Sequence, residues 1–119
     1  MINLDTHILI FALTDQLKPR ERALLMNNRW SISSIVYWEL AMLAKKGRLN
    51  IDLTHRSVSA AIGQIKQWPL DMSIARMSTE LDFSGDPADQ IIAATSIVNE
   101  VPLLTRDKTI LRSNRVPFC

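Results

Sequence analysis

The stretch Ser34-Ile35-Val36-Tyr37-Trp38-Glu39-Leu40-Ala41-Met42-Leu43-Ala44 has the composition of a buried helix and contains a single charged residue, Glu39. On a helix, the neighbours of Glu39 one turn away are all apolar: Ile35, Val36, Met42 and Leu43. A carboxylate in such surroundings has a large desolvation cost unless a cation compensates it, and no Lys or Arg lies within one turn on that face. Glu39 is therefore a candidate site residue, unless it reaches solvent at a helix bend or pairs with a distant arginine.

On both sides of this stretch, short apolar runs alternate with helical periods, which is typical of β–α units around a parallel sheet. The pattern predicts strands at Met1–Leu4, Trp30–Ser33, Trp68–Met72, Pro102–Thr105 and Val116–Phe118. It predicts helices at Thr6–Leu13, Lys18–Asn28, Ser34–Lys46, Thr54–Gln67, Ser73–Leu81, Pro87 to about Asn99 and Lys108–Arg112. We therefore expect one domain over residues 1–119, a three-layer α/β/α sandwich with a central, mostly parallel five-stranded sheet.

The composition is that of a globular protein: 119 residues, of which 47% are hydrophobic and 22% charged, with a formal net charge of +2. A single cysteine, Cys119, forms neither an internal disulfide nor a zinc site, so a reducing compartment is expected. No apolar run reaches the ~20 residues that span a bilayer, and Asp5 interrupts the first one. We expect a cytoplasmic protein with no membrane association.

Three more acids stand at positions where parallel α/β sheets bind ligands. Asp5 ends the first predicted strand, Asp107 follows the strand at Pro102–Thr105, and Asp89 lies in the first turn of the helix before that strand. Ligands sit beyond the carboxyl ends of such strands, so these acids and Glu39 are expected at one edge. Hard oxygen ligands without Cys or His suit Mg²⁺ or Mn²⁺, and two such ions could activate a water and steady the leaving oxygen in phosphodiester cleavage.

Each of these acids also has a purely structural interpretation. Asp5 and Asp107 precede helices and fit the N-cap position, as does Asp86 before Pro87. Asp89 would be the third residue of its helix, where a negative charge suits the helix dipole. Alone, each acid is a weak signal; the metal-site hypothesis depends on their shared position.

Four segments, in this order, resemble the motifs of PIN-domain ribonucleases, specifically the VapC-type toxins of bacterial toxin–antitoxin pairs. They cover almost the whole chain and read Ile2-Asn3-Leu4-Asp5-Thr6-His7, Ser33-Ser34-Ile35-Val36-Tyr37-Trp38-Glu39-Leu40, Asp86-Pro87-Ala88-Asp89-Gln90-Ile91-Ile92-Ala93-Ala94-Thr95 and Leu103-Leu104-Thr105-Arg106-Asp107. The ordered set is far more specific than any one segment.

The resemblance implies a Mg²⁺- or Mn²⁺-dependent endoribonuclease that acts on structured RNA, forms a homodimer and is covered by an antitoxin protein. The residues that would hold the metal are Asp5, Glu39, Asp89 and Asp107. Thr105 would border the site, and Asp86 would be an outer acid. Possible contacts to RNA phosphates fall in two groups that also fit ordinary solvated faces: Lys45, Lys46 and Arg48, and Arg106, Lys108 and Arg112.

One departure from the family pattern is Gln90, where the family commonly has arginine. It is the only direct support for an alternative function, a non-catalytic PIN-like module that binds RNA or a protein. A phosphotransfer enzyme of haloacid-dehalogenase type ranks low, since it needs a second acid at position 7, which is His.

For several other side chains the sequence predicts a position in the core or at the surface and no role in the site. The three tryptophans are expected to build the core, and His7 to lie at the surface. An apolar surface suited to a dimer interface is expected around two predicted helices, at Leu9, Phe11, Tyr37 and Leu40.

Overall fold

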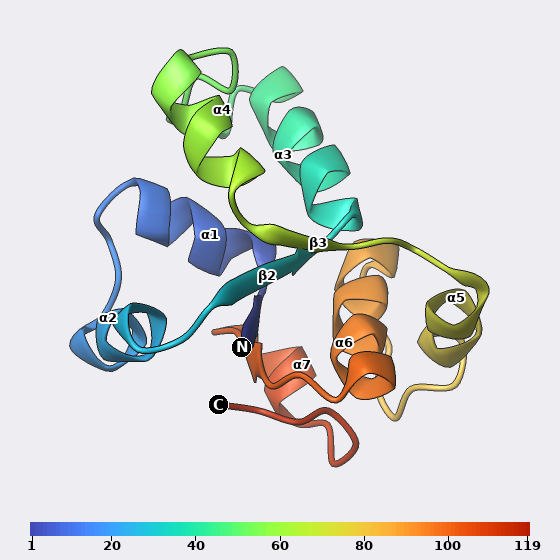
Figure 1. Cartoon of the computed structure of the whole chain (residues 1–119). Helices are drawn as coiled ribbons and strands as arrows, with labels where there is room; N and C mark the ends of the chain where they lie inside the picture. The colour runs from blue at the N-terminus through green and yellow to red at the C-terminus, as the bar shows by residue number, and fades with distance from the viewer.

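The computed structural model describes all 119 residues, from Met1 to Cys119. Short strands alternate with helices along most of the chain, as the hydrophobic pattern predicts (Figure 1). The elements are β1 (Ile2–Leu4), α1 (Thr6–Leu13), α2 (Pro19–Met26), β2 (Trp30–Ser33), α3 (Ile35–Lys45), α4 (Arg56–Gly63), β3 (Lys66–Trp68), α5 (Met72–Ser78), α6 (Pro87–Asn99), β4 (Leu103–Leu104) and α7 (Lys108–Leu111). None of these helices has both the length and the apolar character needed to cross a bilayer.

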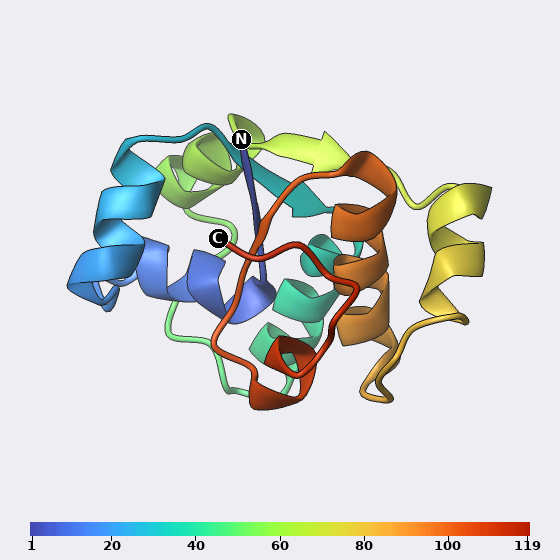
Figure 2. The ribbon, with the colours of Figure 1, turned by 90° about the horizontal axis from the view of Figure 1, so that it is seen from below.

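The four strands form one parallel sheet in the order β3-β2-β1-β4. Helices α1 and α2 lie on one side of it and α5 and α6 on the other, in both views (Figures 1 and 2). This arrangement confirms the three-layer α/β/α sandwich. Because β1 pairs directly with β4, the residues that follow these two strands meet at one edge of the sheet.

The central strand β1 is buried along its whole length and ties the sheet to α6. The Asn3 amide, with no exposed surface, donates to Ser96 Oγ at 3.0 Å and to the Ile92 carbonyl at 3.4 Å, both on α6. Helix α6 can pack this closely because its sheet-facing side carries small residues, Ala93 among them. The position of α6 matters for the site because this helix carries Asp89.

The predicted fifth strand, Val116–Phe118, is wrong. This segment makes only an isolated parallel bridge, in which Phe118 pairs with Leu103. Leu103 N–H donates to the Pro117 carbonyl and Cys119 N–H donates to the Leu103 carbonyl. Pro117 has no N–H to extend the ladder in the other direction, so the sheet has four strands.

The third strand lies earlier than the predicted Trp68–Met72. Lys66–Trp68 pairs with β2, with Lys66 opposite Ser31 and Trp68 opposite Ser33. Pro69 follows at once and has no N–H for a ladder, so the pairing ends there. The predicted helix Thr54–Gln67 is correspondingly too long, since α4 ends at Gly63.

Two expectations about apolar side chains are also wrong. Trp38 is not a core residue: 56% of its surface is exposed. Conversely, Leu9 and Leu40 are buried in the core and cannot contribute to a dimer surface. Single-sequence periodicity did not separate the faces of α3 because residues 34–44 are apolar almost all round.

The Asn3 contacts generate a stability prediction. Replacing Asn3 by Ala removes the donor to Ser96 and leaves a cavity under α6, so the free energy of unfolding should fall by about 1–3 kcal/mol in urea titrations. The control Asn27→Ala removes an exposed amide that donates to Ala23 within one helix, and should change stability by less than about 0.5 kcal/mol. Equal effects of the two substitutions would contradict the role given to Asn3.

Candidate active site

The site begins where β1 and β4 end side by side. Asp5 N–H continues the β1–β4 ladder by donating to the Leu104 carbonyl at 3.1 Å. Thr105, the next residue after β4, donates its hydroxyl to Asp5 Oδ2 at 2.6 Å, and the same hydroxyl accepts from Asp107 N–H at 3.0 Å. Thr105 therefore links two of the predicted acids, Asp5 and Asp107, through one oxygen.

Asp5 and Asp107 combine a structural and a site position, so the two interpretations of each are compatible. Asp5 caps α1, because its Oδ1 accepts from Thr6 N–H at 2.8 Å. Asp107 caps α7, because its Oδ1 accepts from the N–H groups of Thr109 and Ile110. Capping fixes the orientation of both carboxylates while each also lines the pocket described below.

Glu39 and Asp89 approach from two helices. The hydroxyl of Thr6, the residue after Asp5, donates to Glu39 Oε1, so the first turn of α1 orients the α3 carboxylate. Asp89 occupies the third position of α6. No hydrogen-bond donor of the protein reaches its carboxylate, which makes Asp89 the least compensated of the four acids.

These carboxylates line one pocket of about 330 Å³. Its lining comes from α1, α3, the start of α6 and the loop after β4, and consists of Asp5, His7, Ile8, Phe11, Glu39, Asp86, Asp89, Arg106 and Asp107. Five of the nine residues are acids, and Arg106 is the only arginine or lysine among them. The topology thus gathers acids that are up to 102 positions apart in the sequence, from Asp5 to Asp107.

Arg106 does not neutralise this pocket. Its guanidinium forms a two-pronged ion pair with the buried Glu21 carboxylate, with both N–O distances 2.7 Å, and also donates to the Gln16 carbonyl. The guanidinium carbon lies 4.0 Å from the centre of the Phe11 ring. This pairing lowers the pKa of Glu21 and holds the loop between β4 and α7 against α1 and α2. Arg106 is therefore a positioning residue for the loop; its Nε and Nη2 are engaged within the fold, and its contact with RNA stays a prediction.

The pocket raises the pKa of three of its acids. Burial is the main cause at Asp5 and at Glu39, opposed at each by a threonine hydrogen bond. At Asp89, burial together with the charges of Asp5, Glu39, Asp107 and Asp86 raises the pKa from 3.8 to about 7. The only two salt bridges in the chain, Arg106–Glu21 and Arg22–Asp15, involve none of these acids.

The donor set fits a hard divalent cation in its chemistry. It offers carboxylate oxygens without thiols, and its mutual repulsion is of the kind that Mg²⁺ or Mn²⁺ relieves. The present side-chain positions nevertheless include no group of three or more His, Cys, Asp or Glu residues arranged to hold an ion. Ligation of an ion therefore needs a rearrangement of side chains, and Glu39 and Asp89 are the candidates for it, since Asp5 and Asp107 are held by helix-capping bonds and these two are not.

The remaining predicted residues have different surroundings. Asp86 occupies the predicted N-cap position of α6, but its side chain makes no capping hydrogen bond and lines the pocket. Lys46 and Arg48 line an adjoining groove, whereas Lys45 does not. Lys108 and Arg112 are exposed at the two ends of α7, so their role in RNA contact stays a prediction.

Gln90 does not lie in the pocket. Its amide donates to the Ser78 carbonyl at the end of α5, at 3.3 Å, and so joins α5 to α6. A neutral side chain is suited to this inter-helix contact. Gln90 is therefore used in helix packing and is not among the residues that line the pocket.

Sequence reasoning missed three residues of this region. His7 is exposed, as expected, but it also lines the pocket. Its position two residues after Asp5, in the first turn of α1, could have indicated that it lies near the site. Phe11 follows His7 one turn later, but nothing local indicated that Arg106 would cover its ring. Trp38 was hidden by the apolar composition of α3.

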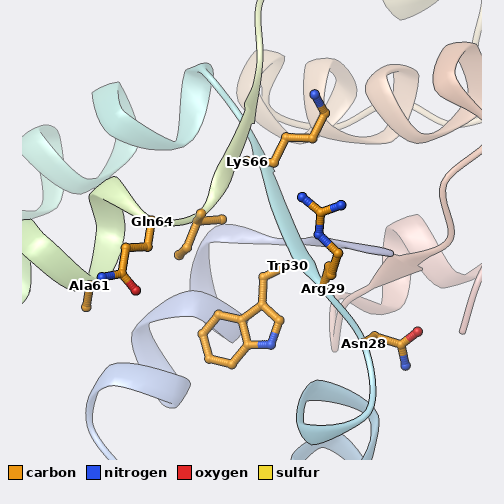
Figure 3. A pocket seen from close by; sticks show the side chains of 7 residues that line it. Asn28, Arg29, Trp30, Ala61, Gln64 and Lys66 are labelled. Atoms are coloured by element: carbon orange, nitrogen blue, oxygen red, sulfur yellow. The ribbon is translucent and has the colours of Figure 1, made fainter.

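A second pocket, of about 400 Å³, lies at the amino ends of β2 and β3, the opposite edge of the sheet (Figure 3). Its lining includes Arg29, Trp30 and Lys66 and contains no acid. The Trp30 indole N–H is used within the fold, donating to the Leu25 carbonyl at 2.8 Å. This pocket lacks the chemistry of the acidic one and takes no part in the site.

The raised pKa of Asp89 predicts how stability without metal depends on pH. Between about pH 4 and pH 7 the folded protein binds more protons at Asp89 than the unfolded chain does, so this carboxyl lowers the free energy of unfolding as the pH rises. With EDTA present, Asp89→Asn should therefore be more stable than wild type at pH 8, by about 1–3 kcal/mol, and the difference should shrink toward pH 4. Urea titrations across this range check it, with the exposed Asp15→Asn as the control. A pH-independent difference would contradict the assignment.

Comparison with known proteins places the chain in a family. The model of the PIN domain family matches residues 2–115. Ribonuclease VapC22 of Mycobacterium tuberculosis is 32% identical over 90 residues, which span 73% of this chain and 68% of the relative.

Solved structures share the fold over the whole chain. VapBC2 from Rickettsia felis, bound to a DNA fragment from its promoter, has a TM-score of 0.76 at 22% identity and covers 100% of this chain and 98% of the other. A toxin–antitoxin complex from Klebsiella pneumoniae has a TM-score of 0.72 at 20% identity, with 94% and 91% covered. FitAcB from Neisseria gonorrhoeae has a TM-score of 0.71 at 22% identity, with 99% and 96% covered. The chain belongs to the PIN-domain family, within its group of VapC-type ribonucleases.

Proposed function

We propose that this protein is a Mg²⁺- or Mn²⁺-dependent endoribonuclease that serves as the toxin of a toxin–antitoxin pair. The observation that carries the proposal is the pocket of five carboxylates, none of which is paired with a lysine or arginine. A fold gains no stability from such crowding, since burial and like charge both raise the cost of ionisation. A bound divalent cation would remove the repulsion between these carboxylates, and the energy released would contribute to its binding affinity.

The four predicted ligands would have unequal tasks. Asp5 is held at both oxygens, by Thr6 N–H and the Thr105 hydroxyl, and is suited to be the fixed ligand. Asp107 is fixed through Oδ1 by its capping bonds. Glu39 has one threonine partner and Asp89 has none, so these two would adjust to the ion. Thr105 would act by positioning Asp5 and Asp107.

A divalent cation bound here would stabilise the negative charge that develops on the phosphate and activate a water for attack. The protein's own part is to fix the carboxylates, to keep the Arg106 guanidinium paired with Glu21 instead of with the pocket acids, and to dock the RNA backbone. Asp86, exposed at the rim and free of capping bonds, is placed to orient a water or the substrate. His7 lines the same rim and can donate a hydrogen bond to a phosphate oxygen.

The proposed partners are an RNA substrate, a cognate antitoxin and a second copy of the chain, acting in the cytoplasm. Support for an antitoxin comes from the family and from the toxin–antitoxin complex among the solved structures that share the fold. An acidic pocket of this kind would be closed most simply by a basic side chain of the antitoxin, which would replace the cation. The alternative of a non-catalytic module rests on Gln90 alone, and the Gln90 amide contacts α5 and not the pocket.

Cleavage assays test the catalytic assignment. Asp89→Asn removes the least compensated acid without breaking a protein hydrogen bond, and should lower kcat/KM for RNA by at least about 100-fold, since even outer partners of a metal site cost about 10- to 100-fold. Asp5→Asn should have a similar effect, with some loss of stability because it is buried and capped. Asp15→Asn, purified in the same way, is the control for contaminating ribonucleases and should keep full activity. Full activity in Asp89→Asn would sink the proposal.

Metal titration separates the nuclease from a structural relic. At pH 7.5, Mn²⁺ at about 100 times its Kd should raise the free energy of unfolding by about 2.7 kcal/mol, measured as a rise in Tm that EDTA reverses. In Asp89→Asn the rise should be mostly lost, whereas in Asp15→Asn it should match wild type. A module that retains the acids without binding metal would show no rise in any of the three proteins.

A further inference from the structure

We propose that the groove beside the acidic pocket is a docking site for single-stranded RNA, in which Trp38 stacks on one unpaired base and Lys46 and Arg48 hold the adjoining phosphates. The inference rests on the proposed function and specifies how substrate reaches the same site. It assigns a role to Trp38, the residue whose exposure contradicts the expectation from sequence.

The groove adjoins the acidic pocket. It has a volume of about 400 Å³ and is lined by His7, Trp38, Glu39, Met42, Leu43, Lys46, Arg48, Asp86, Pro87 and Ala88. His7, Glu39 and Asp86 line both spaces, so a strand lying in the groove has the acidic pocket beside it. Trp38 lines the groove together with Glu39, one of the predicted metal ligands.

Helix α3 arranges the groove residues in a row. Trp38, Met42 and Lys46 are four residues apart and lie on one face, over about 12 Å of helix. Gly47, with φ +69°, then reverses the chain, and Arg48 N–H donates to the Leu43 carbonyl at 2.9 Å. The tight turn brings Arg48 back beside the last turn of α3. A strand bound along α3 would therefore meet Lys46 and Arg48 first, then the Trp38 ring, and then the acidic pocket.

Trp38 has no structural task that explains its position. It is 56% exposed although a large apolar side chain is usually buried, and its indole N–H makes no hydrogen bond to the protein. By contrast, the Trp30 indole N–H donates to the Leu25 carbonyl. An exposed, unpartnered aromatic ring is a surface on which any base can stack, because every base has a π face.

The two cations are available to phosphate. Neither Lys46 nor Arg48 forms a salt bridge or a side-chain hydrogen bond, in contrast to Arg106. The acidic pocket repels the RNA phosphates, and the positive charges of Lys46 and Arg48 beside it reduce this repulsion. An apolar helix of a protein partner would leave Lys46 and Arg48 without partners, whereas the phosphates of RNA would pair with both, which favours RNA as the occupant.

The central experiment measures KM for a short single-stranded RNA that wild type cleaves, with saturating Mn²⁺. Trp38→Ala should raise KM on the order of 10-fold, with kcat within about 3-fold, and Trp38→Phe should restore most of the affinity. The same RNA is then prepared with one base at a time removed. At one position next to the cleaved bond, removal should raise KM for wild type about 10-fold and leave KM of Trp38→Ala unchanged.

Salt dependence tests the cations. On single-stranded RNA each phosphate contact contributes about 0.7 to the slope of log KM against log salt concentration, so Lys46→Ala/Arg48→Ala should lower the slope by about 1.4. Arg56→Ala is the matched control, since Arg56 is exposed, forms no salt bridge, lies outside the groove and is not among the predicted RNA contacts. Its slope should equal that of wild type.

Three results would overturn the inference. Unchanged KM and unchanged base dependence in Trp38→Ala, with wild type active, would refute stacking and leave the proposed function standing. Conversion of a dimer to a monomer by Trp38→Ala, with base dependence retained, would assign this face to a protein interface. A wild type that neither cleaves RNA nor is stabilised by Mn²⁺ would refute the proposed function and this inference together.

Discussion

The parallel pairing of β1 with β4 is the constraint on which the site depends. It brings the residue after each strand to one edge, where the Thr105 hydroxyl donates to the buried Asp5 carboxylate and accepts from Asp107 N–H. Once this link is formed, the first turn of α1 follows directly, and its Thr6 hydroxyl reaches Glu39 on α3. Helix α6 is fixed by the contacts of Asn3 and supplies Asp89. The strand pairing thus sets Asp5 and Asp107, while contacts made by Thr6 and by Asn3 of β1 bring in Glu39 and the helix of Asp89.

The same arrangement makes the protein less stable than its fold allows. Carboxyls whose pKa values are raised by burial and by one another oppose folding near neutral pH. The chain contains cations that could have relieved this, but the best placed of them, Arg106, is engaged by Glu21 and Phe11. Uncompensated charge in a half-buried pocket is the usual condition of a functional site and rarely that of a structural one. The fold thus retains the repulsion that gives affinity for a divalent cation.

Sequence patterns predicted the elements with strong periodicity or clear boundaries. Thr6–Leu13 and Trp30–Ser33 match the observed elements. Asp5, Asp89 and Asp107 were singled out because each follows a strand or begins a helix, and Glu39 because it is the only charge in an apolar helical run. The third and fifth strands were misplaced because their limits depend on prolines at positions 69 and 117, which act only through the hydrogen-bond ladder of a neighbouring strand. A short apolar run alone does not reveal which neighbour it has.

Long-range contacts explain the rest of what sequence could not provide. The sequence near Arg106 gave no indication that this arginine would pair with Glu21, 85 residues away. Nor could the uniformly apolar composition of α3 indicate that Trp38 faces outward. Gln90 departs from the family motif, and its hydrogen bond to α5 could not be predicted from sequence because it depends on how α5 packs against α6.

The central claim is that these acids gather around one divalent cation, and anomalous diffraction from crystals soaked in Mn²⁺ tests it most directly. The account predicts an anomalous peak in the pocket, within about 2.0–2.6 Å of carboxylate oxygens from Asp5 and at least one of Glu39, Asp89 and Asp107, with Glu39 or Asp89 rotated inward. It predicts the loss of that peak in Asp89→Asn or its clear weakening. A pocket without a peak at saturating Mn²⁺, or a peak bound only to acids elsewhere on the surface, would contradict the account.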